Sequence, residues 1–111
     1  MATFSHDEIQ DGLRRLGELA QEQGLQVKLA LVGGAAMVLG YQARQSTRDV
    51  DVVILSPSEA RLVRNLAKRV AAEKNWPEDW LNDGAKGYLV GISEGALLFS
   101  APGIEARSPS T

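Results

Sequence analysis

Two aspartates separated by one residue have the clearest capacity for chemistry in this sequence. Asp49 and Asp51 open the run D-V-D-V-V-I-L, in which carboxylates alternate with branched apolar residues before the run becomes fully apolar. The run predicts a strand over 49–55, and strand side chains alternate with a period of two, so both carboxylates lie on one face. Hard oxygen ligands suit Mg²⁺, and two such carboxylates can share one ion. Without a cation, their mutual repulsion makes burial of the pair costly.

An exposed edge strand is the alternative interpretation of the same pair. The apolar residues 52–55 argue against it, because they place the strand inside a sheet. On these residues alone, metal binding and a solvated face are equally good interpretations. The chain has no cysteine, which excludes disulfides and thiolate metal sites. Any metal must be held by oxygen ligands or by the one histidine, His6, which we expect at the exposed start of a helix.

A glycine pair, Gly33-Gly34, follows the apolar run 27–32 and precedes a helical pattern over 35–42. Glycines let the backbone come close to a ligand, and a helix start behind them offers free N–H groups to a phosphate. A tight turn from strand to helix needs glycine for steric reasons as well. Taken alone, the pair therefore leaves both phosphate binding and a purely structural turn open.

The elements that must position these residues follow from hydrophobic spacing. Ser5 and Glu8 fit a capping box, and apolar residues recur at helical spacing until Gly24, which predicts a first helix. Residues 27–32 predict a buried strand. The remaining expectations are a helix that begins within 56–59 and ends at 75–77, a partly helical segment over 78–86, and strands over 88–92, 97–100 and 104–107. We expect Trp76 and Trp80 to pack in the core, with stacking on a nucleotide base as the alternative.

Length and composition set the limits for these elements. The 111 residues predict one small domain over 1–111. A hydrophobic content of 44% and a charged content of 23% are ordinary for a soluble globular protein. The net charge of −2 provides no overall basic surface for nucleic acid. No run approaches the ~20 apolar residues of a membrane span, and residues 1–11 lack the apolar core of a signal peptide, so we expect a cytoplasmic protein without membrane contact.

In their order and spacing, the glycine pair and the aspartate pair resemble the signature of the nucleotidyltransferase superfamily. The resemblance rests on L-V-G-G-A-A at 31–36 and S-T-R-D-V-D-V at 46–52. It is strongest to small bacterial and archaeal proteins of the kind found in toxin–antitoxin and abortive-infection loci. The segment W-L-N-D-G-A-K-G at 80–87 is also similar to a segment of that subfamily. The resemblance implies an α/β (α+β) fold, in which a small mixed sheet has its helices packed on one face.

The resemblance also implies roles for individual residues. Gly33 and Gly34 would contact the triphosphate of a nucleotide, and Asp49 and Asp51 would be the catalytic residues that bind Mg²⁺.

Thr47 and Arg48, just before the aspartates, would lie at the nucleotide. Arg48 could neutralise phosphate charge, or it could pair with an aspartate as a structural clamp.

The implied reaction is attack by a hydroxyl of a protein or RNA acceptor on the α-phosphate of a nucleoside triphosphate. The metal ions would stabilise the entering and leaving oxygens. A toxin–antitoxin system is the setting that the resemblance suggests.

One departure from the pattern bears on catalysis. Active members of the superfamily usually need a third carboxylate, and neither Glu94 nor Glu105 lies in a recognisable context for it. Related proteins continue into helices where this chain stops at Thr111, so we expect those helices to be lacking. An uncovered apolar face would then favour a homo-oligomer. The alternative functions are an inactive nucleotide-binding or protein-interaction module of the same fold and, more remotely, a purely structural domain.

Overall fold

The computed structural model describes residues 3–40, 46–55, 57–83 and 93–110. Its elements form a mixed α+β fold, as expected. In chain order they are β1 (Phe4–Ser5), α1 (His6–Glu22), β2 (Val27–Val32), α2 (Gly33–Leu39), β3 (Ser46–Thr47), β4 (Val50–Ile54), the 3-10 helix η1 (Pro57–Glu59), α3 (Ala60–Lys74), β5 (Leu81–Asn82), β6 (Ser93–Ala101) and β7 (Ile104–Ser110).

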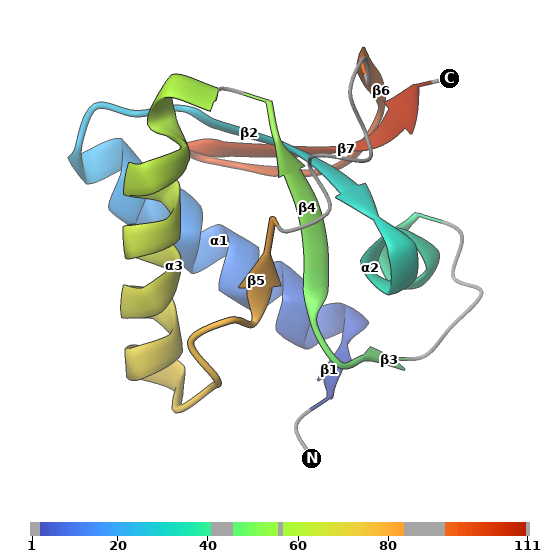
Figure 1. Cartoon of the computed structure of the whole chain (residues 1–111), viewed down its shortest axis with the longest axis horizontal. Helices are drawn as coiled ribbons and strands as arrows, with labels where there is room; N and C mark the ends of the chain where they lie inside the picture. The colour runs from blue at the N-terminus through green and yellow to red at the C-terminus, as the bar shows by residue number, and fades with distance from the viewer. Residues whose placement is uncertain (1–2, 41–45, 56, 84–92, 111) are drawn as a thin grey trace.

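Five of these strands form one mixed sheet in the order β5-β4-β2-β7-β6 (Figure 1). β4 runs antiparallel to β2 and parallel to β5. On the other side of β2, β7 runs parallel to it and forms an antiparallel hairpin with β6. The short strands β1 and β3 pair separately. The sheet thus places the end of β2 beside the start of β4.

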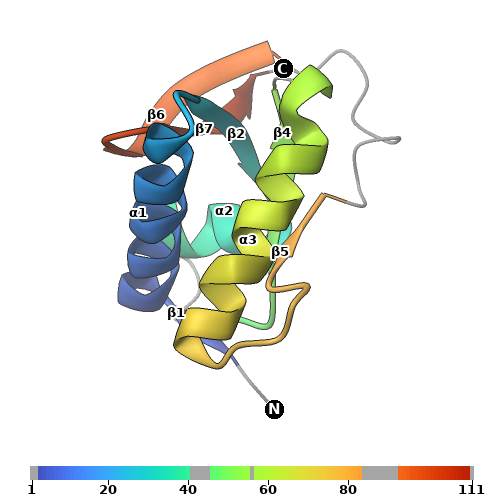
Figure 2. The same cartoon turned by 90° about the vertical axis from the view of Figure 1, so that its left-hand side faces the viewer.

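One face of the sheet is buried and the other is more open. The buried face carries apolar residues from three neighbouring strands, namely Val27, Leu29, Leu31, Val50, Val52, Ile54, Ile104 and Ala106. These residues share one core cluster with the apolar residues of α1 and α3. The two helices lie side by side over this face (Figure 2), as expected for helices packed on one side of a sheet. Alternate residues such as Lys28, Asp51 and Val53 face the other way and are exposed or half-buried.

The first helix forms as its sequence predicts. The Ser5 hydroxyl accepts a hydrogen bond from the Glu8 backbone N–H, and the Glu8 carboxylate accepts one from the Ser5 N–H, which completes the capping box. Gly17 allows α1 to come close to the β6–β7 turn, because a Cβ there would lie 2.5 Å from the Pro102 carbonyl oxygen. Arg15 ties α1 to α3 through Glu73, with 2.7 Å between Nε and Oε1.

The helix expected to begin within 56–59 starts later than its sequence suggests. Residues 57–59 form a 3-10 turn, and α3 begins at Ala60 without a side-chain cap. It ends at Asn75, whose φ of 59° is left-handed, in agreement with the stop expected at 75–77. Short polar side chains tolerate this conformation better than most, which explains the ending.

The prediction of a partly helical segment over 78–86 is wrong for its described part. Within 78–83 the structure has a turn followed by the short strand β5, which pairs with β4. Pairing with an available sheet edge outweighs the weak helical pattern here. The strand expected over 88–92 and residues 84–86 lie outside the described residues.

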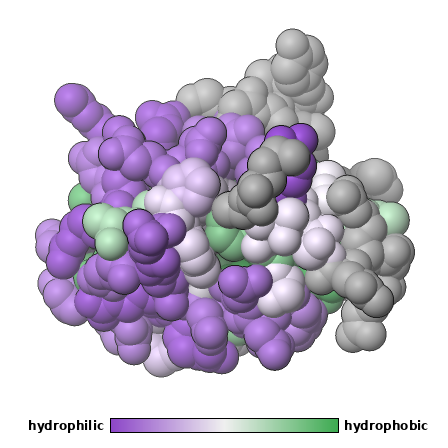
Figure 3. All heavy atoms as spheres, turned by 90° about the horizontal axis from the view of Figure 1, so that it is seen from below, coloured by the Kyte–Doolittle hydropathy of each residue, from purple (hydrophilic) through white to green (hydrophobic). Residues whose placement is uncertain are grey.

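The other predicted elements differ from expectation only at their ends, whereas the short strands β1 and β3 were not predicted. The strands expected over 97–100 and 104–107 are present within the longer β6 and β7. The glycine pair is the first turn of α2 rather than a separate turn. In the described part of the chain, no helix is long and apolar enough to cross a membrane. Hydrophilic residues cover most of the face in Figure 3, which looks at the molecule from below.

Candidate functional site

The glycine pair and the second aspartate meet where β2 ends and β4 begins. Val32 is the register partner of Asp51 in the antiparallel ladder, so Gly33 lies immediately beyond that pair. Gly33 has a φ of 58°, and a Cβ built on it would lie 3.1 Å from Asp51 Oδ2. The left-handed backbone favours glycine at this position, and any side chain there would also press against the carboxylate.

The backbone behind Asp51 carries hydrogen-bond donors. Gly33 and Gly34 form the first turn of α2, and the first N–H groups of a helix have no intrahelical acceptor. Val32, at the N-cap, has no side-chain acceptor to offer them. The start of α2 and the Asp51 carboxylate thus lie next to each other.

The two aspartates influence each other, as their spacing predicts. Burial raises the pKa of Asp51 above its ordinary value of 3.8, and the negative charge of Asp49 raises it further. A hydrogen bond with the Asn82 side chain lowers the pKa and offsets part of this increase. The charge on Asp51 is therefore only partly compensated by its protein neighbours. The two carboxylates could hold a cation, since carboxylate oxygens are hard ligands of the kind that Mg²⁺ prefers.

The two residues before the aspartates occupy different environments. Thr47 is 5% exposed, and its hydroxyl donates a hydrogen bond to the Asp49 carbonyl oxygen at 3.0 Å. That side chain holds the bend before β4 and thereby positions Asp49. Arg48 lies in the same bend with an exposed side chain.

The structure adds Asn82 to these residues. Asn82 is the register partner of Asp51 in the parallel β4–β5 pair. Reasoning from spacing missed it, because nothing in the local sequence pairs residue 82 with residue 51. The resemblance of segment 80–87 to the toxin–antitoxin subfamily was the one signal that pointed to this part of the chain.

The tryptophan pair explains why β5 lies beside β4. Trp80 is 1% exposed, and its indole N–H donates to the Ala67 carbonyl of α3 at 2.8 Å. Its own carbonyl accepts from the Val50 N–H at 2.7 Å. Trp76 packs edge-on against Trp80 and Phe4. Both tryptophans are part of the core packing, and the burial of Trp80 rules out base stacking by that ring.

Among the residues that the structure describes, no third carboxylate joins the aspartate pair. No group of three potential metal ligands occurs among the described residues. Glu105 is the register partner of Lys28, four residues along β2 from Val32, which places it about 13 Å further along the sheet at ~3.3 Å per residue. Glu94 lies on β6, three strands from β4, or roughly 14 Å at ~4.8 Å per strand, and its side chain lies outside the described part.

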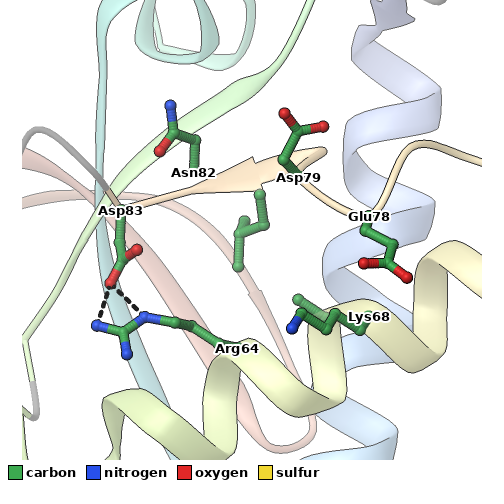
Figure 4. Close-up of a pocket in the computed structure, with 8 residues that line it drawn as sticks. Arg64, Lys68, Glu78, Asp79, Asn82 and Asp83 are labelled. Carbon is green, nitrogen blue, oxygen red and sulfur yellow. Dashed lines mark hydrogen bonds and ion pairs between the residues drawn. The ribbon is translucent and has the colours of Figure 1, made fainter.

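The carboxylate next to Asn82 in the chain is turned toward α3. Asp83 forms an ion pair with Arg64 at 2.9 Å, on the side of β5 away from Asn82 (Figure 4). The residues outside the described ranges contain no aspartate or glutamate. They therefore cannot contribute the third carboxylate either.

A pocket of about 250 Å³ lies between α3 and β5 (Figure 4). It is lined by both basic and acidic side chains, among them Arg64, Lys68, Glu78 and Asp79. Neither aspartate of the pair lines it, although Asn82 contributes to its rim. The pocket is therefore a neighbour of the candidate site and not the site itself.

Comparison with protein families assigns the chain to a family. A family model described as a nucleotidyltransferase of unknown function (DUF6036) matches residues 11–92. The chain belongs to this family. The matched range contains the glycine pair, both aspartates and Asn82, and it stops before β6. Membership confirms the resemblance to nucleotidyltransferases and points to a nucleotide as the substrate. Searches of curated proteins and of solved structures gave no match.

Proposed function

We propose that this nucleotidyltransferase-family protein binds a magnesium–nucleoside triphosphate complex and transfers the nucleotide to a hydroxyl of a protein or RNA acceptor. The site would comprise Gly33, Gly34, Asp49 and Asp51. The observation that carries the proposal is the contact geometry of Asp51, whose Oδ2 lies 3.1 Å from where a Gly33 side chain would begin. Backbone donors for phosphate and acceptors for a cation are thus adjacent.

Electrostatics support a cation at this position. The pKa of Asp51 is raised by burial and by the charge of Asp49, so the folded protein holds negative charge that a divalent ion would offset. When bound, Mg²⁺ would neutralise charge on the triphosphate during transfer. The chain itself would supply the two carboxylates that hold the ion and the glycine N–H groups that face the phosphates.

The preceding bend would assist this arrangement. Thr47 fixes the Asp49 backbone through its hydrogen bond and so determines where that carboxylate lies. We propose that Thr47 acts at the nucleotide site through this positioning. Arg48, exposed in the same bend, would interact with phosphate oxygens through its planar guanidinium group.

A binding module without transfer activity is the second candidate function. It is favoured by one observation: the aspartate pair has no third metal-ligating side chain near it in the described part of the chain. Such a module would use the same residues to bind the nucleotide and would not release pyrophosphate.

Transfer from α-³²P-labelled nucleoside triphosphates separates the two candidates. The protein is incubated with Mg²⁺, each labelled triphosphate, and total RNA or protein as acceptor. If an acceptor becomes labelled with the wild-type protein and not with the Asp49→Asn/Asp51→Asn variant, the result supports transfer. Nucleotide-dependent thermal stabilisation without any labelled product supports the binding module. If the protein shows no thermal stabilisation and no labelled product, both functions are refuted.

The toxin–antitoxin setting is part of the same proposal and has its own test. Induced expression of the wild-type chain in a bacterial host should slow growth, and the Asp49→Asn/Asp51→Asn variant should not. Equal growth with both proteins would contradict this setting while leaving the chemistry to be judged by the labelling experiment.

A further inference from the structure

We propose that the pocket between α3 and β5 binds a free α-amino acid with an apolar side chain. In this site Lys68 faces the carboxylate of the ligand, and Glu78 and Asp79 face its ammonium group. The pocket lies beside the candidate nucleotide site, and neither Asp49 nor Asp51 lines it. Such a ligand site goes beyond the proposed function and does not depend on it.

The two walls of this pocket carry opposite charges. On the α3 wall, Arg64 and Lys68 are one helical turn apart and project from the same side of the helix. The other wall carries Glu78, Asp79 and Asp83, from the chain that leads into and out of β5. A ligand that enters between the walls therefore meets basic side chains from α3 and carboxylates from the β5 segment (Figure 4).

Only part of this charge is neutralised within the protein. Arg64 places both Nε and Nη2 at 2.9 Å from Oδ2 of Asp83, and Figure 4 marks contacts between lining residues only for this pair. Within the described part of the chain, Lys68, Glu78 and Asp79 form no ion pair. One cation on α3 and two carboxylates on the other wall are thus available to a ligand.

The carboxylate wall is held in place by hydrogen bonds of the backbone and of Trp80. Residues 78 and 79 form the centre of a turn, which the Trp80 N–H closes by donating to the Pro77 carbonyl at 3.1 Å. The Trp80 indole N–H donates to the Ala67 carbonyl of α3 at 2.8 Å. The turn is therefore tied to the helix that forms the opposite wall. A site that is formed before binding loses less conformational entropy when its ligand arrives.

The size and the apolar lining of the pocket define the rest of the ligand. Its volume of about 250 Å³ is below the ~300–1,000 Å³ usual for the sites of drug-sized ligands, so the ligand is a small molecule. Ala67 and Leu81 contribute the apolar part of the lining. A free amino acid with an apolar side chain offers a carboxylate, an ammonium group and an apolar surface together. A simple amine or a simple carboxylate offers only one of the two charges.

Titration with L-leucine and two matched analogues, followed by nuclear magnetic resonance of the ¹⁵N-labelled protein, tests the site. The analogue 3-methylbutylamine lacks the carboxylate of leucine, and 4-methylpentanoate lacks its ammonium group. We expect leucine to shift the backbone amide signals of Ala67 and Leu81. Each analogue should bind about 5-fold more weakly, which is the upper end for the loss of one exposed ion pair.

Variants of the two walls should separate the two charges of the ligand. Lys68→Met should weaken leucine binding by the same factor and leave the affinity for 3-methylbutylamine unchanged. The double variant Glu78→Gln/Asp79→Asn should weaken leucine binding and leave the affinity for 4-methylpentanoate unchanged. Arg69→Met is the matched control, because Arg69 is an exposed basic residue of α3 that does not line the pocket. It should bind leucine as the wild type does.

Several results would overturn the amino-acid site. They are the absence of any shift with leucine, equal affinities for leucine and both analogues, and a loss of amine binding in Lys68→Met. Asp49→Asn/Asp51→Asn should bind leucine normally, so a failure of the nucleotide site leaves the amino-acid site standing, whereas weaker leucine binding in this variant would overturn it. Lys68, Glu78 and Asp79 are exposed, so their variants should melt at the temperature of the wild type without ligand, which checks folding.

Discussion

Replacing Asp51 with asparagine should stabilise the protein when no metal is present. Burial and the charge of Asp49 both raise the pKa of Asp51, which means that its charged form costs stability in the folded state. Asparagine keeps the size and shape of the side chain and removes that charge. A residue that lowers stability in the apoprotein is typical of a site kept for ligand binding.

The size of the effect follows from Coulomb's law. Asp49 lies in the bend before β4, two residues from Asp51. At ~3.4 Å per residue of extended chain their separation is about 7 Å, which gives ~0.6 kcal/mol at the dielectric constant of water and ~2.4 kcal/mol at an effective value of 20. Because both aspartates are half-buried, we expect about 1 kcal/mol after allowance for screening by solvent. In a domain of this size, 1 kcal/mol raises the melting temperature by roughly 4–8 °C.

The stability difference between Asp51→Asn and the wild type should depend on pH in a way that only the titration of Asp51 explains. A carboxyl group whose pKa is raised on folding favours the folded state when protonated, and this contribution is lost as pH rises through the raised pKa. The advantage of Asp51→Asn should therefore be full at pH 7, shrink as pH falls through the raised pKa, and vanish below the ordinary value of 3.8. Urea denaturation at several pH values, with EDTA present, measures it.

A matched control and a clear contradiction complete this experiment. Asp79→Asn removes an exposed carboxylate outside the pair and should change stability by less than ~0.5 kcal/mol at any pH. Lower stability of Asp51→Asn at pH 7, or a gain that does not vary with pH, would show that Asp51 carries no uncompensated charge.

Three further predictions concern the glycine turn, the tryptophan anchor of β5 and the ion pair between α1 and α3. Gly33→Ala places a side chain in a left-handed backbone, which should cost ~1–2 kcal/mol of stability. The same side chain would press against Asp51, so the variant should also lose its stabilisation by Mg²⁺ and nucleotide in thermal melts. Gly24→Ala, with a φ of 71° and open space around its Cβ, should lose stability but keep the stabilisation by ligand. Trp80→Phe removes the hydrogen bond to Ala67 and should cost about 1–2 kcal/mol in urea denaturation, whereas Trp76→Phe should cost less; equal losses would contradict the anchoring role of the indole. The exposed Arg15–Glu73 pair should show a coupling below ~1 kcal/mol in a double-mutant cycle. Because Arg15 lowers the pKa of Glu73, that coupling should be present above pH 4.5 and lost as pH falls.

Local chemistry made much of the fold predictable. The capping box at Ser5 and the alternation after Asp49 fix a helix start and a strand through interactions within a few residues. Those signals do not depend on the rest of the chain. The strand character of β5 depends instead on long-range contacts. β5 exists because Trp80 is buried under α3 and because β4 has an edge free for pairing.

The candidate site shows the same division. Strand periodicity predicts that the two aspartates lie on one face; in the structure Asp51 is on β4 and Asp49 is in the bend before it. The contact of Gly33 with Asp51 depends on the antiparallel register of β2 and β4, and the contact of Asn82 with Asp51 depends on the parallel register of β4 and β5. Register is set by the whole buried face of a sheet. No pattern local to residues 33, 51 or 82 could have revealed these contacts.

Thermal stabilisation by Mg²⁺ with each of the four nucleoside triphosphates is the most direct test of the central claim. At a ligand concentration of about 100 times the dissociation constant, binding contributes ~2.7 kcal/mol and should raise the melting temperature by more than ~10 °C. We predict this rise for at least one triphosphate in the wild-type protein and its absence in the Asp49→Asn/Asp51→Asn variant. No rise with any triphosphate, or an equal rise in the variant, would contradict a nucleotide site at Gly33, Asp49 and Asp51.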